Sequence, residues 1–194
     1  PGRVRPVPGP DVVTRIEAGR DVVLTGRQFL EGPRWFEGEL WLSDVIAQRV
    51  LSWDPASGVV TERLALADDR PSGLAFLPSG PGLVSSVRRR LVLDVRTGAV
   101  VADLSALTVG GVNDMVNTGD RVYIGSFGYD VFAREPKAPG NLVTFAPGER
   151  PRVVAEGLAF PNGMVVVDST LLVAETGGDR ITAYDIAADG GLSN

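Results

Sequence analysis

Short apolar runs alternate with turns along the chain, and none of them has the spacing of an amphipathic helix. Most runs are about five residues long, rich in β-branched and aromatic residues, and followed by Gly, Pro, Asp or Ser. Examples are DVVLTG, ELWLSD, RLVLDVRTG, RVYIGSFG, NLVTFAPG and GMVVVDSTLLVAETG. This pattern predicts an all-β fold built from short strands.

The strands recur in a repeating unit. A small or turn residue, a strand, a polar turn and a second strand follow one another in EGPRWFEGELWLSD, PSGLAFLPSGPGLVSS, VNDMVNTGDRVYIGS and FPNGMVVVDSTLLVAE. Alignment on Gly32, Gly73, Asp114 and Gly163 gives spacings of 41, 41 and 49 residues, and each unit is followed by a further strand and hairpin turn. Repeats of about 40–50 residues with four short strands are typical of β-propeller blades. We therefore predict a propeller, with a β-sandwich of coincidental spacing as the alternative.

Four repeats are visible, and we assign residues 1–194 to a single propeller domain. The sequence stops just after a strand and its turn, which is a poor place to close a ring, so we expect an incomplete propeller. The longer third spacing adds residues in FGYDVFAREPKAPG, at positions 127–140. This insertion is predicted to be either a loop over one mouth of the channel, where ligands bind, or a variable surface loop.

Composition excludes several kinds of chemistry. The chain has no histidine and no cysteine, which rules out a Ser-His-Asp triad, a His-ligated zinc site, thiol catalysis and disulfides within it. Catalysis would have to use carboxylates, amides, hydroxyls, arginines or a metal held by oxygen atoms. The net charge of -5 argues against a nucleic-acid partner, and the single basic run, Arg88-Arg89-Arg90, is predicted to be a solvated hairpin edge.

Neither a membrane-spanning stretch nor the apolar region of a signal peptide is visible in the sequence. We therefore expect no membrane partner and a cytoplasmic location. The sequence leaves the oligomeric state open.

Polar residues occupy the same position in three of the repeats: Glu31, Asn113 with Asp114, and Asn162. Taken alone, each could be an ordinary turn residue. Equivalent positions in successive blades converge on the propeller axis, so these residues are expected to be neighbours in space. One carboxylate with amide oxygens at a water-filled mouth is the ligand set expected for Ca²⁺ or another hard divalent cation.

Other polar and aromatic residues have simpler interpretations. Asp44 and Glu175 are predicted to end strands in turns. The three tryptophans, Trp35, Trp41 and Trp53, are predicted to pack the blades and not to form a platform for a sugar.

The motifs EGPRW…LWLSD, NDM…RVYIGSFG and FPNGM…LLVAET…RITAYDI resemble the SMP-30/gluconolactonase/regucalcin family, from about Leu30 to the C-terminus. Members of this family are six-bladed propellers with one divalent metal in the central channel, and many hydrolyse sugar lactones or related esters. By position, the resemblance implies that Glu31 and Asn162 bind the metal. It also implies that Asn113 contacts the substrate or a metal-bound water, with Asp114 beside it.

The loop that covers the site in relatives corresponds to the segment containing Tyr129 and Asp130, which are expected to contact substrate. Some members carry an arginine two residues before the substrate-contacting asparagine. That position is Gly111 here, so sugar-acid specificity of that type is not implied. The family's favoured general base is a metal-binding aspartate in a Pro-Asp-Gly motif one blade later, which would lie beyond residue 194. Residues 1–194 alone are therefore expected to be inactive.

The resemblance thus implies a divalent-metal-dependent hydrolase that opens a sugar lactone or related ester, with a metal-polarised carbonyl and a carboxylate-activated water. Ca²⁺ is the first choice of metal, and Zn²⁺, Mn²⁺ and Mg²⁺ are alternatives. A non-catalytic propeller that binds calcium or a small ligand, or that acts as a regulatory scaffold, is the competing hypothesis, because propellers host both kinds of function.

Overall fold

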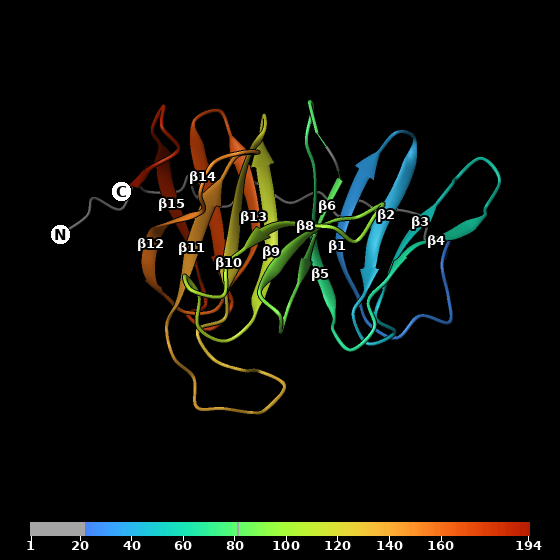
Figure 1. Ribbon diagram of the computed structural model, residues 1–194, viewed down its shortest axis with the longest axis horizontal. Helices are drawn as coiled ribbons and strands as arrows, with labels where there is room; N and C mark the ends of the chain where they lie inside the picture. The colour runs from blue at the N-terminus through green and yellow to red at the C-terminus, as the bar shows by residue number, and fades with distance from the viewer. Residues whose placement is uncertain (1–21, 81) are drawn as a thin grey trace, which may run out of the picture.

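The computed structural model describes residues 22–80 and 82–194, and these form sixteen strands in four antiparallel sheets of four (Figure 1). The first two sheets contain, in order, β1 (Leu30–Phe36), β2 (Glu39–Asp44), β3 (Arg49–Trp53), β4 (Val60–Ala65), β5 (Pro71–Phe76), β6 (Gly82–Ser86), β7 (Leu91–Asp94) and β8 (Val100–Asp103). The last two contain β9 (Val112–Thr118), β10 (Arg121–Ser126), β11 (Gly140–Phe145), β12 (Arg152–Leu158), β13 (Pro161–Val167), β14 (Thr170–Glu175), β15 (Arg180–Ile186) and β16 (Leu192–Ser193).

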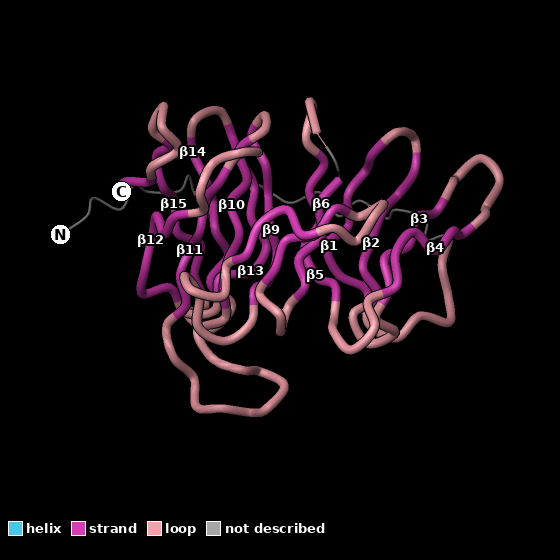
Figure 2. Tube along the Cα trace, in the orientation of Figure 1, coloured by secondary structure: helices cyan, strands magenta, loops and turns pink. Residues whose placement is uncertain are grey.

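Each sheet is a simple meander in chain order, so each sequence repeat forms one blade. This arrangement confirms the all-β propeller prediction, and Figure 2 shows only strands and loops in the described part of the chain. No helix in that part is long and apolar enough to cross a membrane.

The segment before β1 differs from its prediction. Residues 22–26 form no strand, and Val22 and Val23 are 79% and 52% exposed. The three apolar residues of DVVLTG pair with no strand. Asp44 instead binds the backbone of the residues that lead into β1. The Asp44 carboxylate accepts hydrogen bonds from the N–H groups of Gln28 at 3.3 Å and Phe29 at 3.2 Å. Residues 1–21 of the predicted domain lie outside the described residues.

The blades pack face to face through three apolar layers. In the second blade, Leu83 packs into the layer shared with the third blade, whereas its neighbour Val84 packs into the layer shared with the first. In the third blade, Val122 and Tyr123 divide in the same way between the second and fourth blades. This follows from the period of two in a strand, where successive side chains point to opposite faces. Burial on both faces explains the nearly continuous apolar runs of the second and third blades, whereas alternate residues of β13, such as Val165 and Val167, are exposed.

Trp35 and Trp41 differ in burial. Trp41 is buried and packs edge-on against Phe36 and Phe76, which stack with ring centroids 4.2 Å apart. Trp35 is 63% exposed, so its predicted packing role is wrong. Phe36 takes the inward position, and the pleat of β1 therefore turns its neighbour Trp35 to the opposite face.

An irregularity in strand pairing occurs near the start of every inner strand; it has the same repeat position in β5, β9 and β13 and lies one residue later in β1. In β5, β9 and β13, two consecutive residues lie opposite one residue of the neighbouring strand: Ser72-Gly73, Asn113-Asp114 and Asn162-Gly163. In β1, the pairing shifts between Glu31 and Arg34. Bulges of this kind redirect side chains and are common beside functional sites. In β9 and β13 the irregularity includes Asn113 and Asn162, whereas in β1 it follows Glu31.

Two glycines allow the inner strands to approach closely. A Cβ atom on Gly73 would lie 2.5 Å from the backbone nitrogen of Met115 and 2.6 Å from the Cα atom of Asp114, both on β9. Gly32 has a φ of +58°, and a Cβ there would lie 2.8 Å from the backbone oxygen of Ser72. Neither position has room for a side chain, so β1, β5 and β9 pack backbone against backbone beside the site.

Candidate metal and substrate site

The inner strands of the four blades contribute one polar side chain each to a cavity of about 470 Å³. These side chains belong to Glu31 of β1, Ser72 of β5, Asn113 of β9 and Asn162 of β13. The structure therefore brings Glu31, Asn113 and Asn162 together, although 131 residues of sequence separate the first from the last. Equivalent positions in the inner strands of successive blades explain this convergence.

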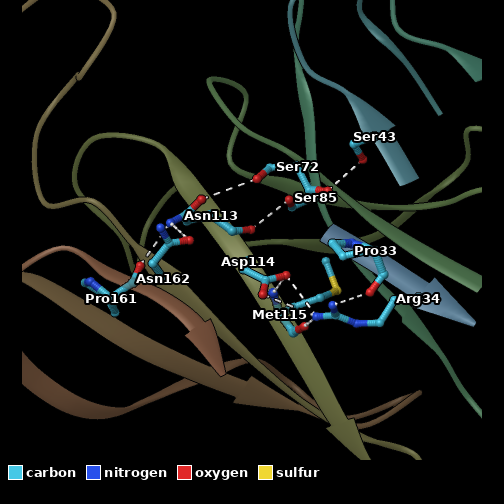
Figure 3. A network of polar contacts seen from close by, with 10 residues as sticks. All are labelled: Pro33, Arg34, Ser43, Ser72, Ser85, Asn113, Asp114, Met115, Pro161 and Asn162. Atoms are coloured by element: carbon cyan, nitrogen blue, oxygen red, sulfur yellow. Dashed lines mark hydrogen bonds and ion pairs between the residues drawn. The ribbon is translucent and has the colours of Figure 1, made fainter. Parts of the chain in front are cut away.

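Asn113 is the centre of the polar network in this cavity (Figure 3). It is 6% exposed, and its side-chain nitrogen donates to Oδ1 of Asn162 and to the backbone oxygen of Pro161, each at 3.1 Å. Its Oδ1 accepts a hydrogen bond from the Ser72 hydroxyl at 3.3 Å, and its backbone oxygen accepts one from the Ser85 hydroxyl at 2.8 Å. All hydrogen-bonding groups of the amide are engaged, so the side chain is held in one orientation.

The amide of Asn162 is oriented from both ends. Its Oδ1 accepts from Asn113, while its Nδ2 donates to the Thr176 hydroxyl at 3.3 Å. A carbonyl oxygen has two lone pairs, so Oδ1 keeps acceptor capacity for a further ligand. Asn162 therefore presents an oriented oxygen at the cavity wall.

Glu31 is a half-buried carboxylate in this cavity. Its pKa is raised above the usual 4.5, first by burial and then by the negative charge of Asp114. Within residues 22–80 and 82–194 its side chain forms no ion pair. A cation beside Glu31 would offset both causes of the raised pKa.

Asp114 points away from Asn113 and pairs with Arg34 across the inner strands (Figure 3). The guanidinium of Arg34 lies 3.0 Å from Oδ1 of Asp114 and also donates to the backbone oxygen of Met115 at 2.5 Å. Burial raises the pKa of Asp114, and the charge of Arg34 opposes that rise. In this structure Asp114 does not line the cavity, and its predicted contact with substrate stays a prediction.

The donor set of the cavity fits a hard divalent cation. In the described part of the chain, no group of three or more His, Cys, Asp or Glu residues is placed to hold a metal. The candidate ligands are instead one carboxylate, from Glu31, and the neutral oxygen of Asn162. Carboxylate and amide oxygens are ligands that Ca²⁺ accepts, whereas softer metals favour nitrogen and sulfur.

The 127–140 insertion takes part in the cavity. Phe127, Val131 and Phe132 line it, which favours the first of the two interpretations given to this loop. Tyr129 and Asp130 lie elsewhere: Tyr129 lines a neighbouring cavity of about 210 Å³, and Asp130 lines another of about 420 Å³. Their predicted role as substrate contacts stays a prediction.

Ser72 and Arg70 are among the cavity-lining residues that were not predicted from the sequence. Ser72 precedes Gly73, which aligns with the glycines of other repeats, so its repeat phase could have identified it. Arg70 lies two residues earlier, and its guanidinium carbon is 4.0 Å from the centroid of the Phe132 ring. No sequence signal relates Arg70 to an aromatic residue of a distant loop.

Asp44 and Glu175 end β2 and β14, as predicted, and both are buried. Glu175 accepts a hydrogen bond from the N–H of Ala159, the loop residue that leads into β13, at 2.7 Å. It also binds Arg180 and Thr182, and the hydrogen bond from Arg180 is the main cause that lowers its pKa to about 2. In the first and fourth blades, these acids connect the end of the second strand to the residues that lead into the inner strand.

Four-stranded blades, with a cavity to which each inner strand contributes a polar side chain, define a β-propeller with a candidate ligand site. Residues 29–194 match the SMP-30/Gluconolactonase/LRE-like region. The chain therefore belongs to this family, as the sequence motifs indicated.

Solved structures share the fold. A luciferin-regenerating enzyme has a TM-score of 0.73 at 18% identity, with 89% of this chain and 61% of that chain covered. Regucalcin from Agrobacterium tumefaciens, a calcium-binding protein, has a TM-score of 0.69 at 23% identity, with 88% and 58% covered. A candidate gluconolactonase has a TM-score of 0.74 at 18% identity, with 88% and 64% covered. No curated protein matches the sequence of this chain.

At these identities the likeness establishes the fold. The chain spans about three fifths of the length of these solved structures, with 61%, 58% and 64% of them covered.

Proposed function

We propose that the complete protein is a divalent-cation-dependent hydrolase that opens a lactone or a related ester. The observation that carries this proposal is the convergence of Glu31, Asn113 and Asn162 on one cavity in a member of the SMP-30/gluconolactonase family. Regucalcin, a calcium-binding protein, and the candidate gluconolactonase among the structural neighbours are consistent with both parts of the proposal.

In this proposal Glu31 and Asn162 hold the cation, with Ca²⁺ as the first choice. When bound, the cation would polarise the substrate carbonyl and stabilise the negative charge that develops on its oxygen. Asn113 fixes the orientation of Asn162 through its 3.1 Å hydrogen bond. The Ser72 hydroxyl, held by Asn113, adds a polar group for a substrate oxygen.

Hydrolysis adds the oxygen of a water molecule to the carbonyl carbon and breaks the ring C–O bond. The proton taken from water returns to the ring oxygen, which leaves as a hydroxyl, so the product is a hydroxy acid. Glu31 is the one carboxylate that lines the cavity in the described part of the chain, and it is assigned to the cation. The proton is therefore assigned to the aspartate that the family resemblance implies beyond residue 194.

The test is hydrolysis of a panel of lactones by the complete protein, monitored by titrating the released acid at constant pH. We expect activity that EDTA abolishes and Ca²⁺, Mn²⁺ or Zn²⁺ restores. Glu31→Gln and Asn162→Ala should each weaken cation binding about 100-fold in a calorimetric titration. Glu37→Gln is the matched control, because Glu37 lies on the outer turn of the same hairpin and is largely exposed.

Undiminished hydrolysis in excess EDTA would contradict the cation mechanism. Cation binding that depends on Glu31, without hydrolysis of any lactone or ester, would favour the non-catalytic binding propeller instead.

A further inference from the structure

Arg70 is a cation at the rim of the candidate site with no assigned partner. It precedes Pro71, the first residue of β5, and so enters the cavity two residues before Ser72. The side chain is half-buried, and its guanidinium carbon lies 4.0 Å from the centroid of the Phe132 ring. Within residues 22–80 and 82–194, no carboxylate lies within ion-pair distance of this guanidinium.

Two carboxylates, that of Asp69 beside Arg70 and that of Asp130 two residues before Phe132, are engaged elsewhere. Asp69 is 1% exposed, and its carboxylate accepts hydrogen bonds from the backbone N–H groups of Arg70 at 2.7 Å, Arg88 at 3.0 Å and Arg89 at 3.0 Å. Asp130 pairs with Arg88 at 3.7 Å. Asp69 therefore fixes the backbone of Arg70 without neutralising its side chain.

Stacking on Phe132 further limits the freedom of the guanidinium. An arginine over an aromatic ring is attracted to the ring face and still keeps its N–H groups in the plane, where they can bind an oxyanion. Because Phe132 belongs to the 127–140 insertion, the loop and β5 build this corner of the cavity together. The result is an oriented, accessible cation.

The rest of the cavity is mostly apolar. Its walls include Phe29, Val87, Phe127, Val131, Phe132 and Phe160. Apart from the four polar residues of the inner strands, the described lining has only Arg70 and Thr176 as polar side chains. The several hydroxyl groups of a buried sugar would each need a hydrogen-bonding partner, and these walls supply few. The cavity therefore suits a ligand with an apolar body.

We propose that Arg70, held over Phe132, binds a carboxylate carried by the substrate away from its reacting carbonyl. The substrate class is then an apolar lactone or ester with a carboxylate substituent. The identity of the reacting group rests on the proposed function above, whereas carboxylate recognition by Arg70 does not. Planar guanidinium groups match carboxylates with two parallel hydrogen bonds, which gives both strength and direction.

The kinetic test uses two lactones that share an apolar body, a carboxyphenyl lactone and the matching neutral phenyl lactone. For the complete protein, Arg70→Gln should raise KM for the carboxyphenyl lactone by about 10- to 100-fold and change KM for the neutral lactone less than about twofold. Arg70→Lys should recover part of the loss, since it keeps the charge without the planar fork. Arg89→Gln is the control, because Arg89 is exposed and lines only the neighbouring cavity.

A binding test separates this proposal from the proposed function. Calorimetric titration with 3-phenylpropionate, an apolar carboxylate that is not hydrolysed, should show binding that weakens at least about tenfold in Arg70→Gln and is unchanged in Arg89→Gln. This result in a protein without lactone hydrolysis would remove the hydrolase proposal and keep the Arg70 site. Equal losses in the two variants, or equal binding of 3-phenylpropionate and its neutral amide to the unaltered protein, would overturn the Arg70 site.

Discussion

The side-chain nitrogen of Asn113 donates to Oδ1 of Asn162 at 3.1 Å, joining the third and fourth blades at the wall of the cavity. The two residues are 49 positions apart in sequence and occupy the same bulge position in successive inner strands. This hydrogen bond orients the amide of Asn162 and therefore the Oδ1 atom that it presents to a ligand. It also links the stability of the two blades to the geometry of the site.

A double-mutant cycle should detect this link. Asn113→Ala removes the three side-chain hydrogen bonds of a buried amide and should lower the free energy of unfolding by about 2 kcal/mol. The double variant Asn113→Ala/Asn162→Ala should lose about 1 kcal/mol less unfolding free energy than the sum of the losses in the two single variants. Urea unfolding of the four proteins measures this coupling, and additive effects would contradict it.

Gly73 should be intolerant of a side chain. Gly73→Ala places a Cβ against the backbone of β9, at 2.5 Å from the nitrogen of Met115, and should cost about 3 kcal/mol of unfolding free energy. Gly163 has the same place in the fourth blade, and a Cβ there meets nothing within 4 Å among the described residues. Gly163→Ala should therefore change stability by less than about 1 kcal/mol. Similar losses in the two variants would refute the close approach of β5 and β9.

The Arg34–Asp114 pair should contribute in a pH-dependent way. Arg34→Met leaves a largely buried carboxylate without its partner and should destabilise the protein by about 3 kcal/mol at pH 7. Burial already raises the pKa of Asp114, and loss of Arg34 should raise it further. The penalty should then shrink as the pH falls and Asp114 becomes neutral, since a neutral carboxyl needs no counter-charge.

Urea unfolding of Arg34→Met between pH 7 and pH 4 checks this prediction. Arg49→Met is the control, because Arg49 pairs with Glu62 on the exposed surface, where an ion pair contributes at most about 1 kcal/mol. A stability difference between Arg34→Met and the unaltered protein that does not vary with pH would show that Asp114 does not carry the effect.

Glu175 should make the fourth blade sensitive to acid. Its pKa of about 2 lies below the usual 4.5, mainly because Arg180 donates hydrogen bonds to it. A lowered pKa in the folded protein means that the stabilising contribution is complete above about pH 4.5 and is lost as the pH falls towards 2.

Glu175→Gln should lower the free energy of unfolding by about 2 kcal/mol at pH 7 and flatten its dependence on pH below 4.5. Glu156→Gln removes the same charge from an exposed position of β12 and serves as the control. Chemical unfolding at pH 7 and at pH 3 provides the measurement. Parallel pH profiles for the two variants would rule out the assigned role of Glu175.

Much of the fold could be predicted from the sequence because strand length, turn residues and repeat spacing are local signals. The shared position of Glu31, Asn113 and Asn162 in the sequence repeat also predicted that they are neighbours, since equivalent positions of successive blades converge. Ser72 shares this position and could have been identified in the same way, although a serine before glycine also has the composition of an ordinary turn.

Other features depend on contacts that no local pattern encodes. Asn113 and Asp114 point in different directions from β9 (Figure 3), and Arg34 reaches Asp114 from a strand 80 residues earlier. The guanidinium of Arg70 is positioned by its contact with the Phe132 ring of the 127–140 insertion. Trp35 and Trp41 differ in burial because the pleat places them on opposite faces, which a prediction by residue type alone could not resolve.

The most direct test of the cation site is an anomalous difference map from crystals of the complete protein grown with Mn²⁺. The proposal predicts one strong peak in the cavity, within bonding distance of the Glu31 carboxylate and Oδ1 of Asn162, and its loss in Glu31→Gln. A fully occupied Mn²⁺ at another site, with the Glu31–Asn162 cavity empty, would contradict it.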